Sequence, residues 1–160
     1  MKHFIYTVLL LLGQQLFAQD SLYKALHLQY DKVGCFDEDG LAVVGKQAYV
    51  GLIDSTGKIR IPFNYDEIKP LTDAYYQVIK NNYVGLLDAN NQVIIPVEYQ
   101  NIIVFSDTLF CVQKEKKYGL LNAKNQWILP CMYEIIYKYK NNYLIVKKEG
   151  LMGMLSPQMQ

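Results

Sequence analysis

Few side chains in this sequence have the type and spacing that catalysis needs. Histidine is the residue that most often transfers protons near neutral pH, and only His27 lies beyond the first 18 residues. A pair of His27 and Cys35 would need a third group to orient it, and no such group stands at a recognisable spacing. Phosphate-cradling glycine loops, zinc patterns and calcium loops are absent from the sequence. We therefore expect no enzyme, no catalytic, cofactor-binding or metal-ligating residues, and no cofactor.

The acidic residues that recur along the chain are explained by turns. Asp54 and Asp88 lie 34 residues apart, and each opens a turn-like run, DSTGK and DANNQ. Aspartate at such a position bonds its own backbone. Because nothing singles out a pair of carboxylates, a hydrolase is the least favoured function.

Tyrosine is the side chain best suited to binding here, with 14 copies in 160 residues. Its flat apolar face and polar tip can stack on a sugar or a peptide. The densest cluster, in the segment YKYKNNY, supplies three candidate ligand contacts, Tyr137, Tyr139 and Tyr143. Packing at the end of the fold is the more favoured role for these tyrosines, and ligand contact is the alternative.

The chain is close to electrically neutral, with 16 basic and 15 acidic residues. A nucleic-acid binder needs a clustered basic excess, so we expect no nucleic-acid partner. Three cysteines, Cys35, Cys111 and Cys131, lack metal-ligand spacing. We expect them to act as small buried hydrophobic residues. An exported protein can oxidise two of them, but the odd number leaves at least one free.

The first 18 residues have the pattern of a signal peptide. MKH supplies a cationic start, an apolar run lies between Phe4 and Gly13, and the small Ala18 stands at the cleavage position. The run is shorter than the ~20 residues that cross a bilayer, which favours cleavage near Ala18 over an uncleaved anchor or a buried helix. We expect a secreted or periplasmic protein with no integral membrane span after cleavage.

A 34-residue repeat dominates the rest of the sequence. The segment YVGLIDSTGKIRIP at Tyr49 returns as YVGLLDANNQVIIP at Tyr83 and as KYGLLNAKNQWILP at Lys117. A fixed period of this size indicates a repeat architecture. We expect the residues that keep the interval to define the repeat structurally. They are Gly51, Gly85, Gly119, Gly153, Pro62, Pro96, Pro130, Tyr65, Tyr99 and Tyr133.

Tetratricopeptide helix pairs share this period, but the residues favour strands. Each repeat has a proline between its apolar stretches, and a proline inside a helix costs about 3 kcal/mol. The stretches are short, rich in Ile, Val, Tyr and Phe, and alternate in polarity. Each repeat is predicted to be a three-stranded meander over YVGLID, KIRIP and AYYQVIK. The second strand is predicted to end at its proline, and a short link through YDEI to follow.

Three positions in the repeat carry specific expectations. Gly57, Asn91 and Asn125 share a turn position that needs a left-handed backbone. Glycine inside a strand marks a bulge or a close approach, and we expect an aromatic ring such as that of Tyr65 to lie over Gly51. The face that carries Ile59 and its equivalents is expected to be core. The equivalent residues are Val93 and Trp127, with Ile61, Ile95 and Leu129 following.

Two incomplete units bound the array, as is typical of capping repeats. We predict an all-β fold of tandem 34-residue β-meander repeats, stacked as a solenoid-like or superhelical array. A propeller-like closed array is the alternative. The predicted organisation is a signal peptide at 1–18, a lead-in with a possible short helix at 19–29, and an array at 30–160. The array has a half unit at 30–48, full units at 49–82, 83–116 and 117–150, and a C-terminal half unit at 151–160.

The segment YVGLIDSTGKIRIPFNYDEI resembles the WG-repeat family, also called KWG repeats. The shared pattern runs aromatic-Gly-aliphatic-aliphatic-Asp, Gly-Lys, aliphatic-Pro and Tyr-Asp-x-Ile, and it covers the chain from about Tyr30 onward. The tryptophan that names the family is replaced by Val50, Val84, Tyr118 and Met152. The resemblance implies a β-rich repeat protein of a kind common in bacteria, often exported, with no catalytic residues to transfer.

Taken together, the sequence favours an exported interaction module of the cell envelope. Its partner is expected to be a protein or another envelope component, bound through the extended surface that repeat stacks provide. Binding of carbohydrate or peptidoglycan through exposed tyrosines is the alternative.

Overall fold

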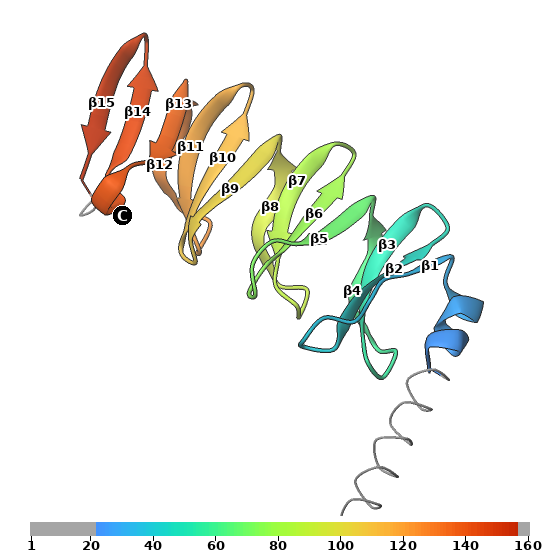
Figure 1. The fold of residues 1–160 in the computed structure, drawn as a ribbon. Helices are drawn as coiled ribbons and strands as arrows, with labels where there is room; N and C mark the ends of the chain where they lie inside the picture. The colour runs from blue at the N-terminus through green and yellow to red at the C-terminus, as the bar shows by residue number, and fades with distance from the viewer. Residues whose placement is uncertain (1–21, 157–160) are drawn as a thin grey trace, which may run out of the picture.

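The computed structural model describes residues 22–156, and antiparallel strands make up most of this part of the chain (Figure 1). Residues 22–29 form a helix, as expected of the lead-in. The signal peptide, its cleavage site near Ala18 and the first residues of the lead-in lie outside the described residues. The strands are β1 (Lys32–Val33), β2 (Leu41–Lys46), β3 (Tyr49–Asp54), β4 (Ile59–Tyr65), β5 (Glu67–Pro70), β6 (Tyr76–Lys80), β7 (Tyr83–Leu87), β8 (Val93–Tyr99), β9 (Asn101–Ser106), β10 (Leu109–Lys114), β11 (Lys117–Asn122), β12 (Trp127–Tyr133), β13 (Ile135–Lys138), β14 (Leu144–Lys148) and β15 (Leu151–Leu155), with a short 3-10 helix η1 (Lys140–Asn142).

The strands form four separate antiparallel sheets that follow one another in an open row (Figure 1). Sheet I is β1 to β4, sheet II β5 to β8, sheet III β9 to β12, and sheet IV β13 to β15, each in chain order. The predicted solenoid-like stack of 34-residue β-meanders is therefore the fold. Its structural unit was predicted wrongly as three strands, because the link after Tyr65 is itself a strand, β5. That strand begins the next sheet, so sheets and sequence repeats are out of phase.

The repeated prolines lie inside strands rather than at their ends. Pro62 is the fourth residue of the seven-residue strand β4, which continues to Tyr65. Proline has no N–H to donate, so it is tolerated where one side of a strand has no partner. Since β4, β8 and β12 are the last strands of their sheets, Pro62, Pro96 and Pro130 interrupt no interior ladder. The prediction that proline ends the second strand was wrong for this reason.

The turns confirm the structural reading of the repeated aspartates. Asp54 Oδ1 accepts hydrogen bonds from the backbone N–H groups of Thr56 (3.0 Å) and Lys58 (3.1 Å). Asp88 and Asn122 make the equivalent bonds in the next two sheets. The left-handed turn position is also confirmed, with positive φ at the three expected residues. They are Gly57 at 83°, Asn91 at 64° and Asn125 at 56°.

The residues that follow Tyr65 and Tyr99 each accept a hydrogen bond from a hairpin turn. Asp66 Oδ2 accepts a hydrogen bond from the backbone N–H of Asn81 at 2.7 Å. Gln100 Oε1 accepts a similar bond from the backbone N–H of Lys116, the second residue of the next sheet's turn, at 3.1 Å. This bond satisfies an N–H in a turn with left-handed backbone, and it accounts for the polar residue in the Tyr-Asp-x-Ile motif.

The hydrophobic core lies between the sheets and divides into one cluster per interface. Leu52 packs toward sheet II, whereas its neighbour Ile53 packs toward the N-terminal helix with Leu26 and Tyr30. Successive residues of a strand point to opposite faces, so burial of both shows that sheet I is covered on both sides. The interfaces between sheets II and III and between sheets III and IV are built in the same way.

The strand glycines allow a close approach, but the approaching group is not the predicted tyrosine. A Cβ added at Gly51 would lie 2.8 Å from the carbonyl oxygen of Ile61 and 3.3 Å from the ring of Phe63. At Gly85 the close atoms belong to Val97 and Ile95, within 2.9 Å. The neighbouring bulged strand therefore lies directly against the glycine. The expected aromatic ring is present at Gly51, but it belongs to Phe63 and not to Tyr65, and at Gly85 the close side chain is that of Val97.

Candidate interaction surface

An exposed row of large apolar side chains runs along one side of the stack. Its members are equivalent in the repeat, and each begins the last strand of its sheet. They are Ile59 (50% exposed), Val93 (58%) and Trp127 (49%). These residues, hereafter the apolar row, were expected in the core, and that prediction was wrong.

A β-bulge explains why the apolar row is exposed. Leu52 pairs with Ile61, but its neighbour Ile53 pairs with Ile59, so Arg60 is an extra residue in β4. Paired residues share a face, and Leu52 and Ile53 face opposite sides. Ile59 and Ile61 therefore lie on opposite faces despite their spacing of two, and only Ile61 enters the core. The same shift occurs in β8 and β12.

Trp127, the member of the apolar row on sheet III, also contacts sheet II. Its ring meets the ring of Tyr99 edge to face, with centroids 6.4 Å apart. It also covers Gly119, where an added Cβ would lie 2.6 Å from Cζ3 of the indole. Burial raises the pKa of the Tyr99 hydroxyl, and Glu98 adds to that effect. The ammonium group of Lys114 lies over the ring of Tyr99, 5.9 Å from the ring centroid.

The three predicted ligand tyrosines lie at the C-terminal end of the row of sheets. Tyr137 is on β13, while Tyr139 and Tyr143 flank η1. The first two are exposed and Tyr143 is half-buried. Backbone bonds fix the loop, since the N–H of Tyr139 donates to the carbonyl of Tyr143 at 2.7 Å. Within residues 22–156, no ring contact joins two of these tyrosines, so they do not form one stacked platform.

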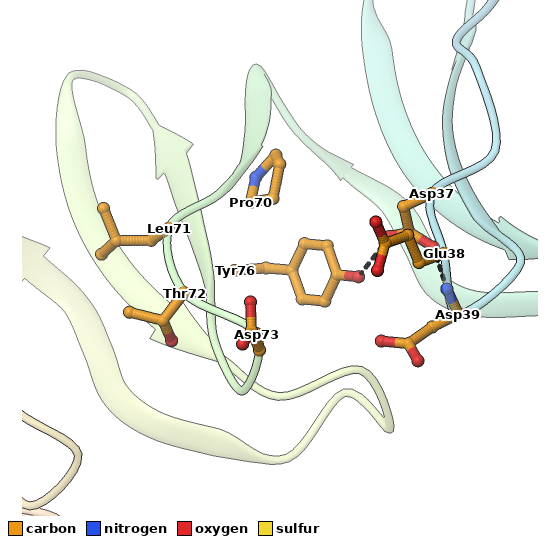
Figure 2. Close-up of a pocket in the computed structure, with 8 residues that line it drawn as sticks. All are labelled: Asp37, Glu38, Asp39, Pro70, Leu71, Thr72, Asp73 and Tyr76. Carbon is orange, nitrogen blue, oxygen red and sulfur yellow. Dashed lines mark hydrogen bonds between the residues drawn. The ribbon is translucent and has the colours of Figure 1, made fainter.

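A pocket of about 490 Å³ lies between the first turn of sheet I and the β5–β6 loop of sheet II (Figure 2). Its lining is acidic on the sheet I side and mixed on the other. The lining residues are Asp37, Glu38, Asp39, Pro70, Leu71, Thr72, Asp73 and Tyr76. Sequence reasoning missed this pocket, because both halves read as ordinary turns and their adjacency arises only from stacking.

The central groups of the pocket have structural roles. Asp37 Oδ1 accepts hydrogen bonds from the backbone N–H groups of Asp39 (3.1 Å) and Leu41 (2.8 Å), so the β1–β2 turn has the same hydrogen-bond pattern as the later Asp54 turn of sheet I. The hydroxyl of Tyr76 donates to Asp37 Oδ2 at 3.2 Å (Figure 2). Burial, assisted by Asp37, raises the pKa of Tyr76 to about 12. The pocket therefore offers negative charge and no activated nucleophile. In the described part of the chain, no group of three or more acidic, histidine or cysteine side chains could hold a metal ion.

The cysteines differ in exposure and none is bonded to another. Cys111 on β10 is fully buried, as expected, and burial raises the pKa of its thiol to about 12. Cys131 is half-buried and its Sγ donates to the carbonyl of Lys117 at 3.0 Å. Cys35 is exposed, so the expectation of burial was wrong for that residue.

No helix within residues 22–156 is long and apolar enough to cross a membrane.

Comparison with known proteins gives a family match and two remote structural likenesses. The family model described as WG containing repeat matches residues 51–83, 85–118 and 118–151. The solved structure titled KlHsv2 with loop 6CD replaced by a Gly-Ser linker shares 13% identity at a TM-score of 0.41, covering 81% of this chain and 50% of that one. Kluyveromyces lactis Hsv2 shares 10% identity at a TM-score of 0.41, covering 79% of this chain and 47% of that one. This chain thus spans about half the length of these structures. No curated protein sequence matches it.

Proposed function

Because the chain belongs to the WG-repeat family, a family of β-repeat proteins, we propose that it is an interaction module that binds another protein along the side of its sheet stack. The module acts in the cell envelope after export and has no catalytic activity of its own. The bound partner is an extended segment that contacts several repeats at once.

The apolar row carries this proposal. Ile59, Val93 and Trp127 expose about half of their surface at one repeat position, and packed sheets lie about 10 Å apart. An exposed series of large apolar side chains with this regular spacing matches a partner that presents an apolar side chain every few residues. Rows of this kind mark protein interaction sites on otherwise polar surfaces.

The lack of catalysis is proposed from the chemistry of the residues at hand. The carboxylates that recur accept hydrogen bonds from their own turns, and the buried phenol of Tyr76 stays protonated at neutral pH. Export is proposed from the sequence pattern of residues 1–18, which has a cationic start, an apolar run and Ala18.

The test uses the full chain as bait in an envelope fraction, with chemical cross-linking. The double variant Ile59→Asp, Val93→Asp alters the row at two exposed positions. The matched control is Ile103→Asp, an exposed apolar residue on β9 that lies outside the row. Circular dichroism and urea denaturation check that all three proteins fold. We expect wild type and control to capture the same protein and the double variant to lose at least tenfold of it. Equal capture by all three would contradict the proposal.

A second candidate, binding of carbohydrate or peptidoglycan, draws on the exposure of Tyr137 and Tyr139 at the C-terminal end. It predicts binding on a glycan array that is lost in Tyr137→Ala and Tyr139→Ala but retained when the apolar row is changed. Absence of binding to glycans and to isolated peptidoglycan would remove this candidate.

A further inference from the structure

Within residues 22–156, the strand β15 has one neighbouring strand where its equivalents have two. In sheets I to III the third strand lies between two others: β3 pairs with β2 and β4, β7 with β6 and β8, and β11 with β10 and β12. Among the described residues, β15 pairs with β14 alone. In Figure 1 β15 lies at the end of the row of sheets with no described strand on its outer side. The backbone groups of that edge are therefore unpaired within residues 22–156.

The side chains of β15 are exposed where their equivalents are buried. Met154 is 60% exposed, whereas Leu52, Leu86 and Leu120 at the same repeat position are 1%, 0% and 0% exposed. Gly153 is also less closely packed than the equivalent glycines of sheets I to III. A Cβ added there would meet only Val146 Cγ2 at 3.5 Å, while at the three inner glycines it would meet the fourth strand within 2.9 Å.

The edge of β15 also lacks the protection that the last strands of sheets I to III have. The outer strands β4, β8 and β12 each contain a proline and a register shift, and both features discourage pairing with a further strand. The sequence of β15, LMGML, has neither proline nor charge. An apolar, regular edge of this kind is a template for strand addition.

The inner sheets define what fits beside β15. In each of them an aliphatic residue pairs with the equivalent of Met154, a proline follows, and a tyrosine pairs with the equivalent of Met152. In sheet II these partners are Ile95 and Tyr99, and Val97 covers the glycine. A second copy that paired its own β15 about Gly153 would place glycine against glycine and leave that position uncovered.

We propose that β15 binds, by antiparallel strand addition, a segment of another polypeptide with the pattern aliphatic-Pro-x-x-Tyr. The tyrosine lies opposite Met152, the aliphatic residue opposite Met154, and the residue after proline over Gly153. This site deepens the proposed function as a protein-binding module, since it identifies a second contact and the sequence class it accepts.

The probe is a fluorescent peptide with the sequence of residues 90–100, NNQVIIPVEYQ, titrated with the full chain and followed by anisotropy. Two protein variants separate β15 from other binding places. Gly153→Val adds a side chain where the free protein has room but where an added strand must pass. Met154→Glu places a charge on an already exposed position. The control peptide carries Asp in place of its Ile95 and Tyr99 equivalents.

We expect the wild-type chain to bind the peptide, and both variants and the control peptide to weaken binding at least tenfold, with unchanged circular dichroism. No binding, or equal binding by wild type and both variants, overturns the proposal. Sedimentation supplies a further outcome. If the free chain is a dimer that Met154→Glu dissociates, the occupant is a second copy and the proposal is wrong. Because the envelope capture described above depends on the apolar row, it can succeed or fail independently of this result.

Discussion

The indole of Trp127 on β12 meets the buried ring of Tyr99 on β8 edge to face, with ring planes at 77°. The contact joins sheet III to sheet II at the edge of the stack. Trp127 is the only tryptophan in the chain and is half-exposed. One residue therefore serves both the interface between two sheets and the proposed binding surface.

Replacing Trp127 is expected to cost more stability than replacing its repeat equivalent. Trp127→Ala removes an aromatic pair worth about 0.5–1.5 kcal/mol beyond the area it buries, so we expect a loss of roughly 1–3 kcal/mol in the free energy of unfolding. Val93→Ala, at the same position in sheet II, is the control and should cost less. Urea denaturation followed by circular dichroism measures both. Equal costs would show that the Tyr99 contact contributes little.

A glycine at the β10–β11 hairpin is expected to stabilise the protein. Glu115 and Lys116 have φ of 52° and 64°, and side chains in the left-handed region cost roughly 1 kcal/mol. The equivalent hairpin in sheet IV already has Gly150. Lys116→Gly should raise the free energy of unfolding by up to about 1 kcal/mol. Lys58→Gly, at a residue without positive φ, should lower it. Changes of the same sign in the two variants would contradict the explanation.

The turn chemistry of this fold was predictable from the sequence because it depends on neighbours in the chain. Asp54 and Gly57 lie within four residues of the groups they serve, and both roles were predicted correctly. The exposure of Ile59 was not predictable. The bulge at Arg60 places Ile59 on the face opposite to Ile61, and no local sequence signal indicates that bulge. The strand β5 was also missed, because its residues EIKP include a charge pair and a proline.

The candidate sites were less predictable, because stacking creates them. The pocket brings Asp37 beside Tyr76, 39 residues later in the chain. The open edge at Met154 is recognised only by comparison with the strands that cover Leu52 and Leu86. The tyrosine cluster was identified by composition alone, and the structure leaves its rings without mutual contact.

Tyr76 is expected to make the protein less stable at high pH. Its pKa rises from 10.0 to about 12, mainly because of burial, with Asp37 adding to the effect. A neutral phenol is thus favoured by folding, so its contribution is complete below pH 10 and is lost as the pH rises toward 12. Tyr76→Phe should reduce the loss of melting temperature over this window. Tyr49→Phe, at an exposed tyrosine, should not. If the melting temperature of Tyr76→Phe depends on pH as that of the wild type does, ionisation of Tyr76 does not cause the loss of stability.

Tyr76→Phe also removes the hydrogen bond to Asp37 that joins sheets I and II. At neutral pH we expect it to lower the free energy of unfolding by about 1 kcal/mol, the usual contribution of such a bond. Because ionisation of Tyr76 removes this bond in the wild type as well, the difference in stability between wild type and Tyr76→Phe should be larger at pH 7 than at pH 11.

The equivalent glycines Gly85 and Gly153 provide the strongest test of the stack. A Cβ at Gly85 would lie 2.6 Å from Val97 Cγ2 and 2.9 Å from backbone atoms of the adjacent strand. Gly85→Val must therefore displace β8, and overpacking of this kind costs roughly 1–3 kcal/mol or more. At Gly153 the nearest atom is Cγ2 of Val146 at 3.5 Å, an ordinary van der Waals distance, so Gly153→Val should change the free energy of unfolding by less than about 0.5 kcal/mol. Urea denaturation of both variants decides the matter. A Gly153→Val variant as unstable as Gly85→Val would mean that β15 is covered in the free protein. The stack would then be closed or paired at its C-terminal end, because only a neighbouring strand makes a side chain at that glycine costly.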